Sequence, residues 1–158
     1  SEYRTQLQEK QKARFTYGLT ERQFRNLYRE ANRKQGVTGE NMLRFLELRL
    51  DNVVYRLGFA TSRAEARQLV KHGHFLVNGR RAHTPSLLVR PGWKVSLREK
   101  SREVARVVGA LEALEGKSIP QWLEVDKTAF EGTIKQLPVR EDITLPIDEQ
   151  LIVEHYSR

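Results

Sequence analysis

Two kinds of residue in this sequence could support metal or acid–base chemistry: the histidines and the paired carboxylates. His72 and His74 are two positions apart and could both bind a metal ion, but no third ligand follows at a recognisable spacing. The acidic pairs at 141–142 and 148–149 could serve a glycosidase or bind a metal, yet prolines flank them and no pocket-forming pattern surrounds them. Cysteine is absent, so thiolate nucleophiles and thiolate zinc sites are excluded within these residues. We therefore expect no enzyme, no metal and no cofactor.

The charge of the chain points to an anionic partner. The net charge is +8, and residues 1–110 carry 23 basic and 10 acidic residues, whereas residues 111–158 carry 5 and 10. Arginine outnumbers lysine by 19 to 9. Arginine binds phosphate with two parallel hydrogen bonds and stacks on bases, so this excess favours nucleic acid. An anionic membrane is the competing partner, but the apolar helix faces have the size of a core, and Trp93 and Trp122 lie outside the basic helices.

The basic residues fall on helix faces. In a helix predicted from a capping box at Thr20, arginines at positions 22, 25, 29 and 33 share one stripe without interleaved acids. Such like charges destabilise a helix by about 0.2–0.5 kcal/mol per pair, so we expect a bound anion to offset the repulsion, although a solvated polar face is the alternative. Similar stripes are predicted on helices over 40–57 and 62–73, and the start of the latter offers free N–H groups to phosphate. The candidate RNA-binding residues are Lys10, Arg14, Arg22, Arg25, Arg29, Arg33, Arg49, Asn52, Arg56, Ser62, Arg63, Arg67, Lys71, His72, His74, Asn78, Arg80 and Arg81.

The order of predicted elements indicates an α+β protein with a helical N-terminal part. Hydrophobic periodicity and capping signals predict helices over 2–17, 20–34, 40–57, 62–73, 101–114 and 147–156. Alternation and turn signals predict strands over 75–77, 80–83, 93–97, 122–125 and 133–137. Asn78-Gly79 is the strongest hairpin signal.

The residues themselves resemble a known family. Residues 49–74 (RLDNVVYRLGFATSRAEARQLVKHGH) and 77–80 (VNGR) closely resemble the RNA-binding module named after the bacterial small-subunit ribosomal protein S-four. That module alone also occurs in RNA-modifying and tRNA-charging enzymes. Residues 7–12 (LQEKQK), 17–27 (YGLTERQFRNL) and 152–158 (IVEHYSR) extend the resemblance to the ribosomal S-four family over nearly the whole chain.

The resemblance implies a fold and a function. It implies a discontinuous helical domain, residues 1–47 with about 140–158, and an inserted S-four-type RNA-binding domain with its extension, residues 48–139, in which two helices pack on a small, mainly antiparallel sheet. It also implies a structural rRNA-binding protein that acts in the cytoplasm, in the ribosome. Such a protein binds 16S rRNA early, at a multi-helix junction of the 5′ domain, nucleates assembly of the small-subunit body and contributes to translational accuracy.

Two alternatives place the same module outside the ribosome, in an RNA-modifying enzyme or in a translational repressor. Arg49-Leu50-Asp51 resembles the motif that carries the catalytic Asp of pseudouridine synthases. Here the motif falls in a regular amphipathic helix without the surrounding sequence of that family, so we interpret Asp51 as a structural or helix-surface carboxylate. The S-four family also carries about forty further residues upstream, basic and in some members cysteine-bearing. We therefore expect this chain to be N-terminally truncated, without the zinc site of some members.

The acidic C-terminal segment should point away from the RNA, because like charges would oppose association there. Ribosomal proteins are mostly basic, and the resemblance implies contact with ribosomal protein S-five. We predict that this contact involves all or some of four carboxylates, with solvation alone as the alternative: Glu141, Asp142, Asp148 and Glu149.

Overall fold

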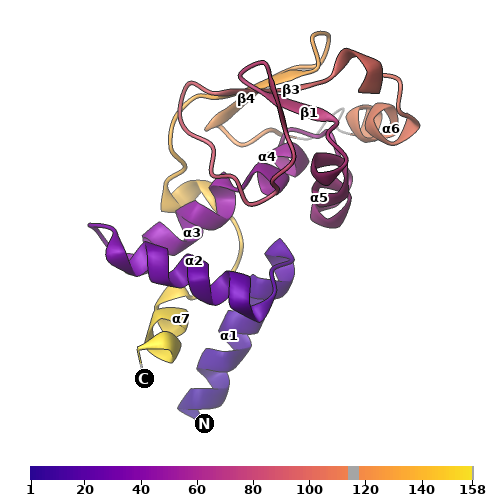
Figure 1. Cartoon of the computed structure of the whole chain (residues 1–158). Coiled ribbons are helices and arrows are strands. Elements are labelled where there is room, and N and C mark those ends of the chain that lie inside the picture. The colour runs from indigo at the N-terminus through magenta and orange to yellow at the C-terminus, as the bar shows by residue number, and fades with distance from the viewer. Residues whose placement is uncertain (114–117, 158) are drawn as a thin grey trace. The chain divides into compact units, whose positions relative to one another are not determined.

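The computed structural model describes residues 1–113 and 118–157, and the chain divides into two compact units. Unit 1 comprises Ser1–Glu47 and Val139–Arg158, and unit 2 comprises Leu48–Pro138. Unit 1 is helical, whereas unit 2 combines helices with a five-stranded sheet (Figure 1). This arrangement confirms the predicted α+β class.

Unit 1 is built from two segments that are far apart in the sequence. Its helices are α1 (Glu2–Tyr17), α2 (Glu21–Arg33), α3 (Thr38–Leu48) and α7 (Glu149–Tyr156), with a 3-10 turn η2 at Arg140–Asp142. Helix α7 lies beside α1 (Figure 1). Residues from both segments share one apolar core: Ala13, Tyr17, Phe24, Met42, Leu43, Leu46, Ile143, Ile147 and Ile152 are all buried.

Local signals explain where the helices of unit 1 begin and end. Gly18 takes the left-handed conformation, φ 73°, and its N–H bonds to the last carbonyls of α1. The capping box of α2 is present in full, since the Thr20 hydroxyl accepts from the N–H of Gln23 while the Gln23 side chain accepts from the N–H of Thr20. The sequence predicts both the end of α1 near Tyr17 and the start of α2 at Thr20.

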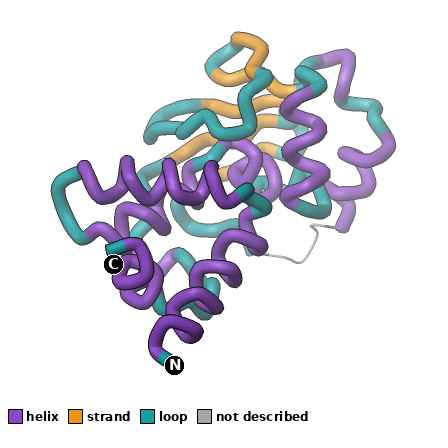
Figure 2. The backbone as a smooth tube through the Cα atoms, turned by 60° about the horizontal axis from the view of Figure 1, so that its bottom comes forward, coloured by secondary structure: helices purple, strands orange, loops and turns teal. Residues whose placement is uncertain are grey.

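Unit 2 contains a five-stranded sheet, whose strands are orange in Figure 2. All its strand pairs are antiparallel, and the strand order is β2-β1-β3-β5-β4. The strands are β1 (Phe75–Val77), β2 (Arg80–Ala82), β3 (Lys94–Leu97), β4 (Leu123–Asp126) and β5 (Glu131–Ile134). Positive φ at both Asn78 and Gly79, 51° and 84°, makes the β1–β2 connection the hairpin turn expected for that dipeptide.

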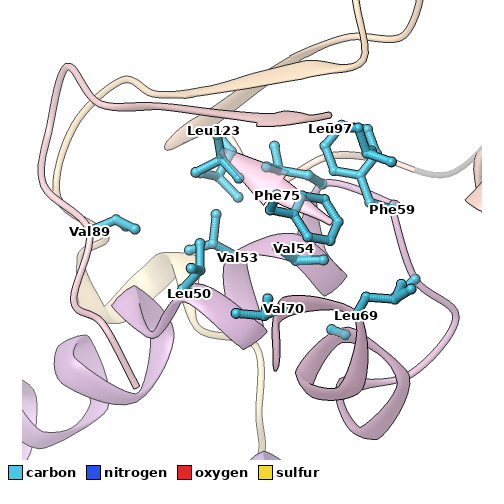
Figure 3. Close-up of a cluster of buried hydrophobic side chains, with 14 of the residues drawn as sticks. Leu50, Val53, Val54, Phe59, Leu69, Val70, Phe75, Val89, Leu97 and Leu123 are labelled. Atoms are coloured by element: carbon cyan, nitrogen blue, oxygen red, sulfur yellow. The ribbon is translucent and has the colours of Figure 1, made fainter. Parts of the chain in front are cut away.

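One face of the sheet is covered by α4 (Leu50–Arg56) and α5 (Arg63–Lys71). Leu50, Val53 and Val54 of α4 and Leu69 and Val70 of α5 point toward strand residues such as those at 75, 97 and 123, as Figure 3 shows. Because α4, α5 and the sheet share one buried cluster, α5 keeps a fixed position relative to the β1–β2 hairpin.

The single long helix predicted over 40–57 is wrong. Helix α3 ends at Leu48, Arg49 is extended with φ −60° and ψ 139°, and α4 then begins. The segment 85–89 replaces the missing helical hydrogen bonds, because the N–H of Leu50 donates to the carbonyl of Leu87 at 2.8 Å and the carbonyl of Leu48 accepts from the N–H of Val89 at 3.0 Å. These partners are almost forty residues away in sequence, so hydrophobic periodicity alone predicts an unbroken helix.

Smaller differences concern the remaining elements. A 3-10 turn η1 (Glu99–Ser101) precedes α6 (Ala105–Ala113), so that helix starts later than predicted, and its predicted end near Gly116 lies outside the described residues. Strand β5 begins two residues earlier than predicted. The last helix, α7, begins at Glu149 behind its N-cap Asp148.

Candidate nucleic-acid interface

Helix α5 carries a row of three basic residues. Arg63, Arg67 and Lys71 recur at intervals of four and therefore form one row along the helix, roughly opposite the buried Leu69. Lys71 is exposed, and the two arginines are half-buried. We call the surface formed by these three residues the basic α5 face.

A buried carboxylate beneath this face holds one of its arginines. Asp51 accepts hydrogen bonds from Arg49 at 3.0 and 3.2 Å, from Arg67 at 3.4 Å and from the N–H of Asn52 at 2.7 Å. The Asp51 side chain is 2% exposed and that of Arg49 is 6% exposed, whereas that of Arg67 is 26% exposed. Asp51 thus links the start of α4 at Arg49 to helix α5. Of the two interpretations made from the sequence, it is the structural carboxylate and not a helix-surface one.

Asn52 and Tyr55 position the second arginine. The Nε of Arg63 donates to the Oδ1 of Asn52 at 2.9 Å, and its guanidinium lies 4.7 Å from the centre of the Tyr55 ring. The guanidinium of Arg56 lies 6.0 Å from the same ring. A guanidinium fixed by an amide and an aromatic face loses little further freedom when it binds a phosphate.

The hairpin continues the basic surface of unit 2. Arg80 and Arg81 are exposed on β2, and the turn is fixed because Asn78 Oδ1 accepts from the N–H of Lys94 at 2.9 Å. Gly73, with φ +77°, follows α5, and a Cβ there would lie 2.6 Å from Nη2 of Arg81. Only glycine therefore allows the Arg81 guanidinium to lie against the end of α5.

Helix α2 presents a second basic row in unit 1. Arginines 22, 25, 29 and 33 are all exposed, while Phe24, Tyr28 and Ala31 are buried on the other side. Arg33 pairs with Glu30 at 3.0 Å, and both side chains stay mostly exposed. Within the described residues Arg22 and Arg29 have no ion pair, so the basic α2 face keeps most of its charge for a ligand.

Four predicted RNA contacts have internal roles. Lys10 is buried and binds Glu21 at 2.7 Å, and Arg14 binds the same carboxylate at 3.2 Å and the Leu19 carbonyl at 3.0 Å, which joins α1 to α2. Arg49 and Asn52 are buried as described above. Helical spacing shows which residues share a face but not whether that face is exposed or buried. Each of these four side chains is bound within its own unit.

The remaining candidates predicted from the sequence lie at the two ends of α5. Ser62 caps that helix, since its hydroxyl accepts from the N–H of Glu65 at 3.1 Å. His72 is exposed, whereas His74 is half-buried with Nδ1 2.8 Å from the hydroxyl oxygen of Ser101. The two imidazole rings are 6.4 Å apart, and the described residues contain no group of three or more metal-ligating side chains.

The acidic candidates are engaged within unit 1 to different degrees. Glu149 binds Nε of Arg140 at 2.7 Å, and Asp142 accepts from the N–H of Val139 at 2.8 Å. Asp148 is the N-cap of α7 and accepts from the N–H of Gln150 at 3.2 Å. The Glu141 side chain is exposed and forms no hydrogen bond or ion pair with another described residue. Of the four, Glu141 is the carboxylate most available to a partner.

The pKa values of two groups in unit 1, Glu21 and Tyr156, are shifted from their ordinary values. The hydrogen bond from the Lys10 ammonium holds the pKa of Glu21 below its ordinary value, and a nearby Arg14 adds to the effect. Burial raises the pKa of Tyr156 to about 12. Glu21 links α1 to α2 through its ion pairs with Lys10 and Arg14, and the Tyr156 ring packs against Phe24 and Tyr28 of α2.

Sequence reasoning missed Tyr55 and the supporting role of Asn52. Asp51 was identified from the motif Arg49-Leu50-Asp51, and the structure adds that its buried carboxylate pairs with Arg49 and Arg67. Tyr55 has no comparable signal, because an aromatic residue at helical spacing is indistinguishable from a core residue until the position of Arg63 is known.

Known proteins resemble this chain over its whole length. The ribosomal protein S4/S9 N-terminal domain matches residues 1–47, and the S4 domain matches residues 48–95. The small ribosomal subunit protein uS4 of Geotalea daltonii and that of a Geobacter species are each 61% identical over 158 residues, and that of Pelobacter propionicus is 59% identical. Each comparison covers 100% of this chain and 76% of the relative. The chain belongs to the uS4 family.

Membership of the uS4 family confirms the resemblance found in the sequence. The boundary between the two family matches, 47/48, coincides with the boundary between unit 1 and the start of unit 2. The S4 domain match contains α4, α5, the hairpin and the first half of β3, and so includes the basic α5 face. None of the described helices is long and apolar enough to cross a membrane.

Proposed function

We propose that this uS4 protein is a structural, non-enzymatic component of the small ribosomal subunit that binds 16S rRNA in the cytoplasm. The observation that carries this proposal is the 61% identity, over all 158 residues of this chain, to proteins named small ribosomal subunit protein uS4. The two basic helix faces supply the chemistry that the role requires. These relatives are named ribosomal proteins, so the similarity does not favour a role for this chain outside the ribosome.

Binding proceeds through phosphate neutralisation on a rigid scaffold. Each Arg or Lys that replaces a counterion on RNA contributes a salt-dependent, sequence-independent increment of affinity. Double-stranded RNA hides its bases in a deep, narrow major groove, so a protein with exposed arginines reads mainly its shape. Asp51 and Asn52 orient Arg67 and Arg63 before binding, which lowers the entropic cost of each contact.

The finer site is a multi-helix junction in the 5′ domain of the 16S rRNA. A junction brings phosphates of several helices together, and two separate basic faces suit such a target better than a single duplex. By holding the junction in one shape the protein nucleates assembly of the subunit body and contributes to translational accuracy. The proposed RNA contacts are Arg22, Arg25, Arg29, Arg33, Arg56, Ser62, Arg63, Arg67, Lys71, His72, His74, Asn78, Arg80 and Arg81.

A triple substitution tests the basic α5 face. Replacement of Arg63, Arg67 and Lys71 by Ala should lower the log–log salt slope of rRNA binding by roughly 0.7–0.9 for each phosphate that the protein no longer neutralises. The control variant carries Lys127→Ala and Lys135→Ala, two exposed lysines elsewhere in unit 2, and should keep the wild-type slope. An equal slope in wild type and triple variant would remove α5 from the interface.

The acidic segment faces a protein neighbour. We place ribosomal protein S-five at the η2 and α7 end of unit 1, with Glu141 as its main carboxylate contact, because Asp142, Asp148 and Glu149 are partly used for capping and for the Arg140 ion pair. A basic protein surface complements an exposed carboxylate there.

Glu141→Lys tests this contact. The variant should weaken association with S-five and raise misreading in assembled ribosomes, while affinity for naked rRNA stays the same. Loss of rRNA affinity without any change in misreading would place Glu141 on the RNA side and contradict the assignment.

A further inference from the structure

An open pocket lies at the hairpin end of the unit 2 sheet. It has a volume of about 740 Å³ and is formed by β1, β2, the segment 83–87 and Trp93. Cavities of roughly 300–1,000 Å³ are the usual size of sites for small organic groups. Helices α4 and α5 cover other parts of the same apolar cluster, and Val77, Ala82, Leu87 and Trp93 pack at its edge, where they are only half-buried.

The lining of the pocket separates into an apolar and a polar part. The four half-buried residues, Val77, Ala82, Leu87 and Trp93, are apolar, and every exposed lining residue is polar. The polar part includes the cations Arg80 and Arg81 and also His83, and the lining contains no carboxylate. An aromatic and aliphatic floor with a basic rim matches the two parts of a nucleotide, the planar base and its phosphate.

Hydrogen bonds hold the walls of this pocket in place without a ligand. The segment 85–89 is fixed to the start of α4, where the N–H of Leu50 donates to Leu87 at 2.8 Å and that of Asp51 donates to Pro85 at 3.1 Å. The backbone of Trp93 is fixed to β5, because its carbonyl accepts from the N–H of Ile134 at 2.9 Å. A binding site that is already formed does not lose affinity to the ordering of its own walls.

We propose that this pocket binds one unpaired nucleotide of the bound RNA, with the base stacked on Trp93 and the phosphate at Arg80 and Arg81. This inference rests on the proposed rRNA-binding function and adds a local recognition step to it. Unstacked bases in loops and bulges can turn outward and stack on aromatic side chains, whereas bases inside a duplex cannot. The free nucleotide has the same chemistry, and the test below separates the two sources.

The test compares two RNAs that differ by one nucleotide. One is a continuous duplex, and the other carries a single bulged 2-aminopurine, whose fluorescence reports stacking. Wild-type protein should bind the bulged RNA roughly fivefold or more tightly, as expected for one stacked base. Trp93→Leu should abolish this preference and the fluorescence change, while its affinity for the continuous duplex stays the same.

Two further variants guard against misfolding and against general aromatic effects. Thr84→Phe should fill the pocket from an exposed lining position and remove the preference without truncating the core. Phe15→Leu alters an exposed aromatic residue of unit 1, 67% exposed, and should keep the preference. Preference retained in both Trp93→Leu and Thr84→Phe would overturn the pocket assignment.

The remaining outcomes separate the pocket from the general function. Equal binding of both RNAs by wild-type protein would overturn the nucleotide pocket and leave the proposed function intact. If the wild-type protein binds none of the three RNAs, the duplex, the bulged RNA and the 16S rRNA, the proposed function itself is overturned. Adenosine monophosphate should compete weakly with the bulge preference, and saturation of the pocket by micromolar AMP would identify a free nucleotide as the occupant instead.

Discussion

Replacement of Asp51 by Asn should destabilise unit 2 strongly, because it leaves a buried guanidinium without its counterion. The Asp51 side chain is 2% exposed and that of Arg49 is 6% exposed. Removal of one partner from a buried ion pair costs about 3–5 kcal/mol. Asn can still accept one hydrogen bond, and Arg67, at 26% exposure, can turn to water. We therefore expect a loss near the lower end, about 3 kcal/mol.

Tryptophan fluorescence in urea measures this loss in the intact chain. Both tryptophans, Trp93 and Trp122, lie in unit 2, so the signal reports the unfolding of that unit alone. With a slope of about 2 kcal/mol per molar urea, a loss of ~3 kcal/mol lowers the midpoint by ~1.5 M. Glu124→Gln is the matched control: it removes one exposed carboxylate from β4 and should cost less than about 0.5 kcal/mol.

A double variant decides the physical reason for the loss. If the cost comes from the unpaired Arg49, then Arg49→Met combined with Asp51→Asn should be more stable than Asp51→Asn alone. An Asp51→Asn variant that is destabilised by less than about 1 kcal/mol, or a double variant whose destabilisation is the sum of the two single effects, would refute the buried-anchor reasoning.

Three other perturbations follow from packing and titration. Gly132→Ala should cost unit 2 about 1–3 kcal/mol in the same urea assay, since a Cβ there would overlap the Leu57 side chain; an unchanged midpoint would show that Leu57 moves freely. Tyr156 keeps its proton to about pH 12, whereas an unfolded tyrosine ionises near 10, so wild type should lose stability between pH 10 and 12 relative to Tyr156→Phe in thermal melts followed by circular dichroism. The pKa of Glu21 is lowered, first by its hydrogen bond from Lys10, so the ionised carboxylate stabilises the fold above the ordinary pKa of 4.5. That stability is lost as the pH falls through the lowered pKa. The melting temperature of Glu21→Gln should therefore depend less on pH in the acid range than that of wild type.

Local signals in the sequence predict most of the helices and the hairpin. The capping box at Thr20, the left-handed Gly18 and the dipeptide Asn78-Gly79 each act within a few residues, so their effects are visible without tertiary information. The break at Arg49 is different. Its cause is the segment 85–89, whose hydrogen bonds compete with the helix from a distant part of the chain.

The candidate site could be predicted in type but not in detail. Arginine stripes at helical spacing indicate a basic face, and this holds for α2 and α5. Spacing cannot distinguish an exposed cation from one bound internally, as with Lys10 and Arg49, because that depends on which neighbouring element supplies a carboxylate. The return of the C-terminal segment to α1 also has no periodic signal and came only from the family resemblance.

Chemical footprinting of small-subunit rRNA, with and without the intact protein, tests the central claim most directly. The uS4 assignment predicts protection confined to one multi-helix junction in the 5′ domain, weakened by the triple substitution at Arg63, Arg67 and Lys71. Protection spread evenly along duplex RNA, or no protection at near-physiological salt, would contradict it.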